Sequence, residues 1–256
     1  MKFSEKNITN LHLGLTKSCA LGCPGCCRNH LDSILQLDTL FESDIFEWEK
    51  YKEVITIPGI EHFLLCGNWG DPIYYKYLLE LCEFIKQNTT ASITMHTNGS
   101  YKTTEFWQQL GSILRSNDEI MFSIDGISNN FTTYRKNADW SSIEQAIKAL
   151  TKKHFNNSRR ANIVWKYLVF NYNIYTIIEA IRTAIHLRID AIEIIAGDTK
   201  QTPELAIDWN TNEVLSEALK TFKYLKNYEV QDTEHKKWIY LDITSYHNVS
   251  MKNLTE

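Results

Sequence analysis

Four of the six cysteines in the sequence lie within nine positions, at Cys19, Cys23, Cys26 and Cys27. Thiols this close together suit three kinds of site: disulfides, a structural zinc ion or an iron–sulfur cluster. Disulfides fit poorly because Cys26 and Cys27 are adjacent, and a bridge between neighbours strains the backbone. The cytoplasm, where we expect this protein, is a reducing compartment and also disfavours structural disulfides.

The cysteines alone leave zinc and an iron–sulfur cluster open. A structural zinc site takes four Cys or His ligands, and His30 could supply the fourth, although a second C-x2-C pair is absent. The spacing Cys19-x3-Cys23-x2-Cys26 instead offers three thiolates on a short loop and leaves one position open. A four-iron cluster held in this way has one iron that can bind another ligand.

The composition is that of an ordinary globular protein. The chain has 256 residues, of which 43% are hydrophobic and 23% are charged, so it can form one large domain or two small ones. Its polar beginning does not resemble a signal peptide, and no apolar run reaches the ~18 residues of a membrane span. We therefore expect a cytoplasmic protein with no membrane contact. The formal net charge of −4 argues against a broad nucleic-acid-binding surface.

Hydrophobic periodicity predicts strands that alternate with helices. Strands are expected over 11–15, 61–67, 92–99, 119–126, 162–170 and 190–197. Helices are expected over 77–87, 104–116, 141–155 (capped by Ser141 or Ser142), 174–188 and 212–227, with one more within 31–52. Such alternation predicts parallel strands joined by right-handed crossovers. Six units are too few for an eight-fold barrel and fit an incomplete barrel or an open doubly wound sheet.

Polar residues and glycines follow each predicted strand at the same end. The cysteine loop follows the first strand, GNWGDP (67–72) the second and TNG (97–99) the third, while the fourth ends in Ser123, Asp125 and Gly126. In both architectures the chemistry gathers at the carboxyl ends of the strands. The sequence therefore predicts one site that is built from several strand ends.

With these motifs in order, the sequence resembles the radical S-adenosylmethionine (radical SAM) superfamily. The resemblance rests on the C-x3-C-x2-C loop, GNWGDP, HTNG, and SIDG with a later Tyr134-Arg135, and it covers roughly residues 8–200. It implies an α/β fold, a partial (β/α)6 TIM-like barrel with parallel strands. Residues 1–200 would form this core. Residues 201–256 would form a C-terminal extension packing on the core, whose strand-like segment 236–243 closes the open side or mouth of the barrel.

The resemblance also implies the cofactors, a four-iron four-sulfur (4Fe-4S) cluster and SAM. In such enzymes three thiolates, here those of Cys19, Cys23 and Cys26, hold the cluster, and its open iron chelates the amino and carboxylate groups of SAM. An electron from an external donor such as flavodoxin or ferredoxin then cleaves SAM to methionine and a 5′-deoxyadenosyl radical. This radical abstracts hydrogen from the substrate.

Six further residues are implied as SAM contacts. The Gly70-Asp71-Pro72 turn would offer backbone acceptors to the amino group, Ser123 and Asp125 would face the ribose or carboxylate, and Arg135 would pair with the carboxylate. Simpler interpretations stay open: Asp71-Pro72 as a capping turn, Asp125-Gly126 as an ordinary turn, and Arg135 as a solvated charge.

The sequence departs from the family pattern in the cysteine loop and in the turn that follows the second strand. Gly25 stands where the family usually has an aromatic residue that packs near the adenine, so another side chain would have to make that contact. Cys27 makes the third ligand position ambiguous, and Asp71 replaces the more common glutamate.

The remaining cysteines and histidines have simpler expected roles. We expect Cys66 and Cys82 to be buried apolar residues. His12, His62 and His96 lie on or beside strands and are interpreted either as contacts of SAM or substrate or as core histidines.

The substrate is the open question. SIDG with Tyr134-Arg135 resembles the branch that modifies peptides and proteins, and a small metabolite or nucleotide is the alternative. The absence of a second cysteine cluster predicts a single-cluster enzyme without an auxiliary-cluster domain. A zinc- or cluster-stabilised binding module without catalysis is the alternative from another class. Methyl transfer from SAM is a weaker interpretation, because no G-x-G-x-x-G turn is present.

Overall fold

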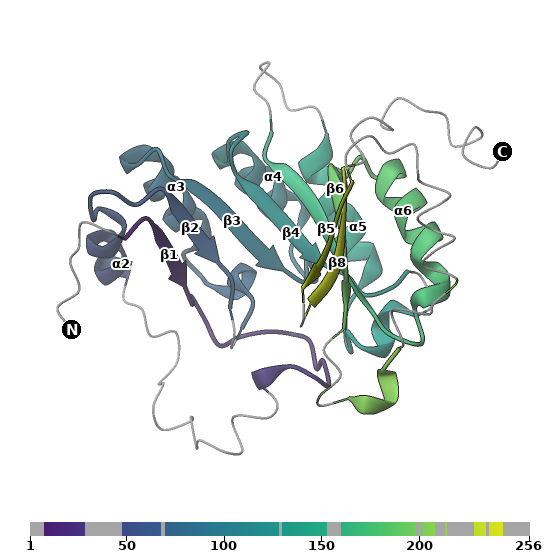
Figure 1. Cartoon of the computed structure of the whole chain (residues 1–256). Helices are drawn as coiled ribbons and strands as arrows, with labels where there is room; N and C mark the ends of the chain where they lie inside the picture. Colours follow the sequence, from purple (N-terminus) through teal and green to yellow (C-terminus); the bar gives the residue numbers. More distant parts are fainter. Residues whose placement is uncertain are drawn as a thin grey trace.

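The computed structural model describes the predicted barrel region and two strands beyond it (Figure 1). The described residues are 8–28, 48–67, 70–127, 130–152, 160–197, 200, 202–207, 213, 228–233 and 236–242. His30, Trp69 and nearly all of the predicted helix 212–227 lie outside them.

Six parallel strands form the frame of the fold, in the order β1-β2-β3-β4-β5-β6. Their bounds are β1 Asn10–Leu13, β2 His62–Leu65, β3 Ser92–Thr97, β4 Glu119–Ser123, β5 Asn162–Val169 and β6 Ala191–Ala196. Each lies within or next to a predicted strand, and the sheet does not close on itself. The predicted fold class, a partial (β/α)6 barrel, is therefore confirmed.

Helices connect these strands and lie on one side of the sheet (Figure 1). They are α2 Trp48–Ile55, α3 Leu78–Asn88, α4 Thr104–Ile113, α5 Trp140–Thr151 and α6 Ile177–His186. Thr103 caps α4, and its side chain accepts from Phe106 N at 3.3 Å. The cap of α5 is Asp139, which accepts from Ser142 N at 2.8 Å, so the predicted cap at Ser141 or Ser142 is wrong by two to three positions.

The two faces of the sheet differ in polarity because side chains alternate along each strand. On β3, Ile93, Met95 and Thr97 are buried, whereas Ser92, Thr94 and His96 are half-buried on the other face. The first face packs in the main hydrophobic core with residues of the helices. The second face is the interior of the incomplete barrel and carries polar side chains.

Two antiparallel strands extend the sheet beyond β6. Strand β8 (Lys236–Asp242) pairs with β6, and β7 (Tyr228–Thr233) pairs with β8. The strand predicted over 236–243 is thus present. It adds to the β6 edge, and among the described strands none joins this edge to β1. The expected closure of the open side or mouth stays a prediction. The division into a 1–200 core and a 201–256 extension stays a prediction.

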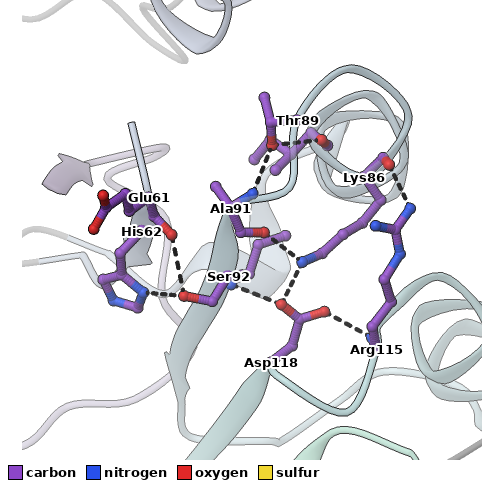
Figure 2. A network of polar contacts seen from close by, with 10 residues as sticks. Glu61, His62, Lys86, Thr89, Ala91, Ser92, Arg115 and Asp118 are labelled. Atoms are coloured by element: carbon purple, nitrogen blue, oxygen red, sulfur yellow. Dashed lines mark hydrogen bonds and ion pairs between the residues drawn. The ribbon is translucent and has the colours of Figure 1, made fainter. Parts of the chain in front are cut away.

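A buried polar network fastens the amino ends of β3 and β4 (Figure 2). Lys86 Nζ donates to Ala91 O at 2.8 Å and to the Asp118 carboxylate. Asp118 also accepts from Ile93 N at 2.7 Å and from Arg115 N at 2.6 Å. This network lies at the opposite end of the strands from the cysteine loop, where it joins the end of α3 to the segments that enter β3 and β4.

Candidate active site

A cavity of about 320 Å³ lies at the carboxyl ends of the strands, next to the cysteine loop. The chain that leaves β1 runs beneath these strand ends (Figure 1). Side chains from the loops and from the strand interiors share the walls of the cavity. They are Cys19, Leu21, Cys23, Cys26, Cys27, Arg28, Cys66, Gly67, Gly70, Asp71, His96, Thr97, Asn98, Ser123, Tyr134, Arg135, Lys166 and Leu168.

Backbone hydrogen bonds fix the cysteine loop against its neighbours. Gly22 N donates to Lys136 O at 3.0 Å, and Asp71 N donates to Ser18 O at 2.9 Å. Inside the loop, Cys26 N donates to Cys23 O at 3.1 Å, which makes a tight turn between the two cysteines. The loop is therefore held from both sides, by the segment after β4 and by the segment after β2.

All three predicted cluster ligands line the cavity, and hydrogen-bond donors approach two of their sulfurs. Cys19 Sγ accepts from Leu21 N at 3.4 Å and from Asn98 Nδ2 at 3.6 Å. Arg135 Nη1 lies 4.0 Å from Cys23 Sγ. Burial raises the pKa of the Cys19 and Cys23 thiols, while the cations Arg28 and Arg135 act in the opposite direction. Donors and cations of this kind stabilise a thiolate once it binds metal.

These thiols fit an iron–sulfur cluster chemically. In such a cluster each cysteine binds a different iron, so the sulfurs must surround a volume and need not converge on one point. Among the described residues, no three His, Cys, Asp or Glu side chains converge on a single ion. Cys27 also lines the cavity beside Cys26, and the choice of Cys26 as the third ligand stays a prediction from spacing.

The loop after β2 is compact because two of its glycines have no room for a side chain. A Cβ on Gly67 would lie 1.9 Å from Gly70 O, and a Cβ on Gly70 would lie 2.3 Å from Thr16 O. Gly70 therefore lets the cysteine loop pass directly over this turn. Pro72 begins the 3₁₀ helix η3 (Pro72–Tyr74) and is buried outside the cavity lining.

The Asp71 side chain joins the ends of β2 and β3. It accepts from Ile73 N at 3.1 Å, which caps η3, from Thr97 Oγ1 at 2.9 Å and from Asn98 N at 2.6 Å. Burial raises the pKa of this carboxyl to about 6, although the hydrogen bonds from Asn98, Ile73 and Thr97 lower it. The capping interpretation of Asp71-Pro72 is thus present in the structure, and Asp71 also belongs to the cavity lining.

Ser123 and Asp125, both predicted as site residues at the end of β4, lie in different surroundings. Ser123 lines the cavity. Asp125 is fully buried and does not line the cavity: its carboxylate accepts from Arg135 Nε at 2.6 Å and from Leu168 N at 2.8 Å. Both Asp125 oxygens therefore have protein partners. Asp125 therefore holds Arg135, which lines the cavity, and the expected contact of Asp125 with SAM stays a prediction.

An aromatic ring fills the space beside Gly25. A Cβ on Gly25 would lie 2.7 Å from Tyr134 Oη, and the Tyr134 ring stacks on Phe170 with centroids 4.6 Å apart. Tyr134 lines the cavity next to the cysteines. An aromatic side chain from the segment after β4 therefore lies beside the cysteine loop at Gly25.

Three further residues line the cavity from the barrel interior: Cys66 at the end of β2, His96 on β3 and Lys166 on β5. Cys66 and Lys166 were not predicted as site residues, whereas a contact with SAM or substrate was one of the two interpretations of His96. Cys66 is half-buried, so its expected role as a buried apolar residue is wrong, whereas Cys82 is fully buried as expected. The alternation of β5 was the available signal for Lys166, because every second residue of that strand faces the interior.

The fold and the site together define a class: an incomplete parallel α/β barrel with a thiol-lined cavity at the carboxyl ends of its strands. The chain belongs to the radical SAM superfamily, whose sequence model matches residues 13–182. The comparison with curated proteins finds no match. In the described part of the chain, no helix is long and apolar enough to cross a membrane.

Solved radical SAM enzymes share the fold at low sequence identity. TYW1 with a lysine-pyruvate adduct bound gives a TM-score of 0.56 at 16% identity, over 89% of this chain and 77% of its own. SuiB of Streptococcus suis bound to S-adenosylmethionine gives a TM-score of 0.56 at 16% identity, over 84% of this chain and 46% of its own. Coproporphyrinogen III oxidase (HemN) of Escherichia coli gives a TM-score of 0.56 at 11% identity, over 90% of this chain and 54% of its own. The present chain thus spans about half the length of SuiB and HemN.

Proposed function

We propose that this enzyme cleaves SAM reductively at a 4Fe-4S cluster bound by Cys19, Cys23 and Cys26, and that it abstracts hydrogen from a peptide or protein. The observation that carries the proposal is one cavity whose lining includes these three thiols, Arg135, Gly67 and Gly70. When bound, the cluster supplies the electron that splits SAM into methionine and a 5′-deoxyadenosyl radical.

The chain would orient SAM with groups from three strand ends. The backbone of Gly70 and its neighbours would accept from the amino group, and Ser123 would face the ribose or carboxylate. Arg135 would pair with the carboxylate, held in position by Asp125. Asp71 and Pro72 would shape the turn. An external donor such as flavodoxin or ferredoxin would deliver the electron, in the reducing cytoplasm that free thiols require.

A peptide substrate is favoured by the resemblance of SIDG and Tyr134-Arg135 to the peptide-modifying branch. Two structures that share the fold contain a peptide: SuiB bound to precursor peptide SuiA, and anSMEcpe with AdoMet and the Cp18Cys peptide. TYW1 and HemN share the same fold, so the fold alone does not choose the substrate. A small metabolite or a nucleotide is the alternative.

The first test is anaerobic reconstitution with iron and sulfide, followed by dithionite and SAM without substrate. We expect a brown protein and the appearance of 5′-deoxyadenosine by mass spectrometry. A colourless protein that carries zinc and leaves SAM intact would overturn the proposal in favour of a binding module.

Cysteine variants test the ligand assignment. Cys19→Ala, Cys23→Ala and Cys26→Ala should each lose the cluster absorbance and all 5′-deoxyadenosine, because a cluster with two protein ligands is poorly held. Cys27→Ala is the matched control and should retain both. A cluster that survives in all three of the first variants would contradict the assignment.

A further inference from the structure

The interior face of β4, β5 and β6 carries residues beyond those that the proposed cofactor site uses. Met121, Val164 and Ala191 lie in register on these strands and form an apolar cluster. Two residues further along each strand, Ser123, Lys166 and Glu193 lie in register and face the same side. A polar row therefore lies between the apolar cluster and the carboxyl ends of the strands, and its members Ser123 and Lys166 line the cavity.

Lys166 brings a cation with available hydrogen-bonding capacity into this cavity. Its side chain is 27% exposed, and Nζ lies 3.8 Å from Glu193 Oε2, beyond the length of a direct hydrogen bond. Within the described residues, no group accepts a direct hydrogen bond from Nζ. An ammonium has three donors, and a half-buried one is stabilised by each anion or acceptor that reaches it.

His96 stands beside Lys166 as a neutral hydrogen-bonding group. Burial, together with the neighbouring Lys166 and His12, lowers the pKa of this imidazole to about 4. At neutral pH the ring therefore carries no charge and can donate one N–H. An ammonium with three donors and an imidazole with one suit a ligand group that only accepts hydrogen bonds.

We propose that Lys166, assisted by His96, binds a carboxylate of the substrate inside the barrel, so that the substrate is an acid. This inference rests on the proposed function, because it takes the part of the cavity next to the cysteine loop as the SAM site. Ser123 adjoins Lys166 in the strand register and belongs to that proposed site. A carboxylate on Lys166 would thus place the carbons next to it beside the bound SAM. An acidic side chain, a peptide carboxyl terminus and a free amino acid all offer this group.

The test measures binding to the reconstituted, SAM-bound enzyme without reductant, by calorimetry. Three probe pairs distinguish the sources: a blocked tripeptide with central glutamate or glutamine, acetylated trialanine with a free or amidated terminus, and free alanine or alaninamide. In at least one pair we expect the acid to bind tenfold or more tightly than its amide. Equal binding of acid and amide in all three pairs would overturn the inference.

Variants then assign the preference to Lys166. Lys166→Met should abolish it, Lys166→Arg should keep part of it, and the exposed control Lys148→Met should leave it unchanged. Glu193→Gln removes a competing carboxylate and should tighten acid binding, a gain that misfolding cannot produce. A preference that survives in Lys166→Met, in a sample with full cluster content, would overturn the inference. The proposed function fails separately, when wild-type enzyme yields no 5′-deoxyadenosine.

Discussion

At the scale of single residues, the pair of Asp125 and Arg135 carries charge next to a cluster ligand. The guanidinium lies between the Asp125 carboxylate, 2.6 Å from Nε, and Cys23 Sγ, 4.0 Å from Nη1. Both side chains are largely removed from water, with exposed fractions of 0% and 16%. Charges act strongly at such distances when water is excluded. Arg135 should therefore favour the reduced, more negative cluster, and Asp125 should oppose it.

This geometry predicts opposite effects of two substitutions on the reduction potential of the bound cluster. Asp125→Asn leaves the Arg135 charge uncompensated and should raise the reduction potential by at least about 59 mV. For one electron, this corresponds to a tenfold change in the ratio of reduced to oxidised cluster. Arg135→Met should lower it by less, because the unpaired Asp125 takes up a proton. Redox titration monitored by electron paramagnetic resonance measures both. Shifts in the same direction would mean that the pair only shapes the loop.

At the scale of elements, the cysteine loop depends on contacts with segments that lie far away in the sequence. Gly70 lies against the backbone of residues 16–18, and Tyr134, which follows the 3₁₀ helix η4 (Phe131–Thr133), packs against Gly25. Tyr134 is itself fixed by stacking on Phe170 after β5. The loop therefore takes its shape from several strand ends and not from its own residues alone.

A double-substitution experiment tests the contact between Gly25 and Tyr134. Gly25→Ala places a Cβ 2.7 Å from Tyr134 Oη and should lower the free energy of unfolding by about 1–3 kcal/mol. Combined with Tyr134→Phe, which removes the hydroxyl, most of this loss should disappear, because the next ring atom is 3.5 Å away. Urea unfolding gives the free energy of unfolding of the wild type, the two single variants and the double variant. Additive losses would show that the two positions do not meet.

The same contacts explain which features the sequence could predict. Strand and helix positions follow from local periodicity, and all six parallel strands were located from it. The partners of Asp125 were not predicted. Leu168 N becomes its neighbour through the pairing of β4 with β5, and Arg135 through the folding of the segment after β4. The pairing of β8 with β6 was missed for a similar reason, because an alternating pattern predicts a strand but not the strand with which it pairs.

At the scale of the whole molecule, the two ends of the strands have different tasks. The carboxyl ends hold the cavity with its polar and thiol side chains. The amino ends of β3 and β4 hold the Lys86–Asp118 pair, whose side chains are 4% and 0% exposed (Figure 2). Residues at the amino-terminal face of such barrels typically serve stability, and residues at the other face serve chemistry. Stability and activity should therefore respond to different substitutions.

Lys86→Met tests this separation. It removes the cation from a buried carboxylate that still accepts from Ile93 N and Arg115 N, and it should lower the free energy of unfolding by about 3–5 kcal/mol. The exposed Lys148→Met is the matched control and should change it by less than about 0.5 kcal/mol. Chemical unfolding gives both values. Below the unfolding transition, 5′-deoxyadenosine production per cluster by Lys86→Met should equal that of the wild type, because the network lies at the far end of the strands. A loss of turnover per cluster at full folding would show that the amino-terminal network also positions the site.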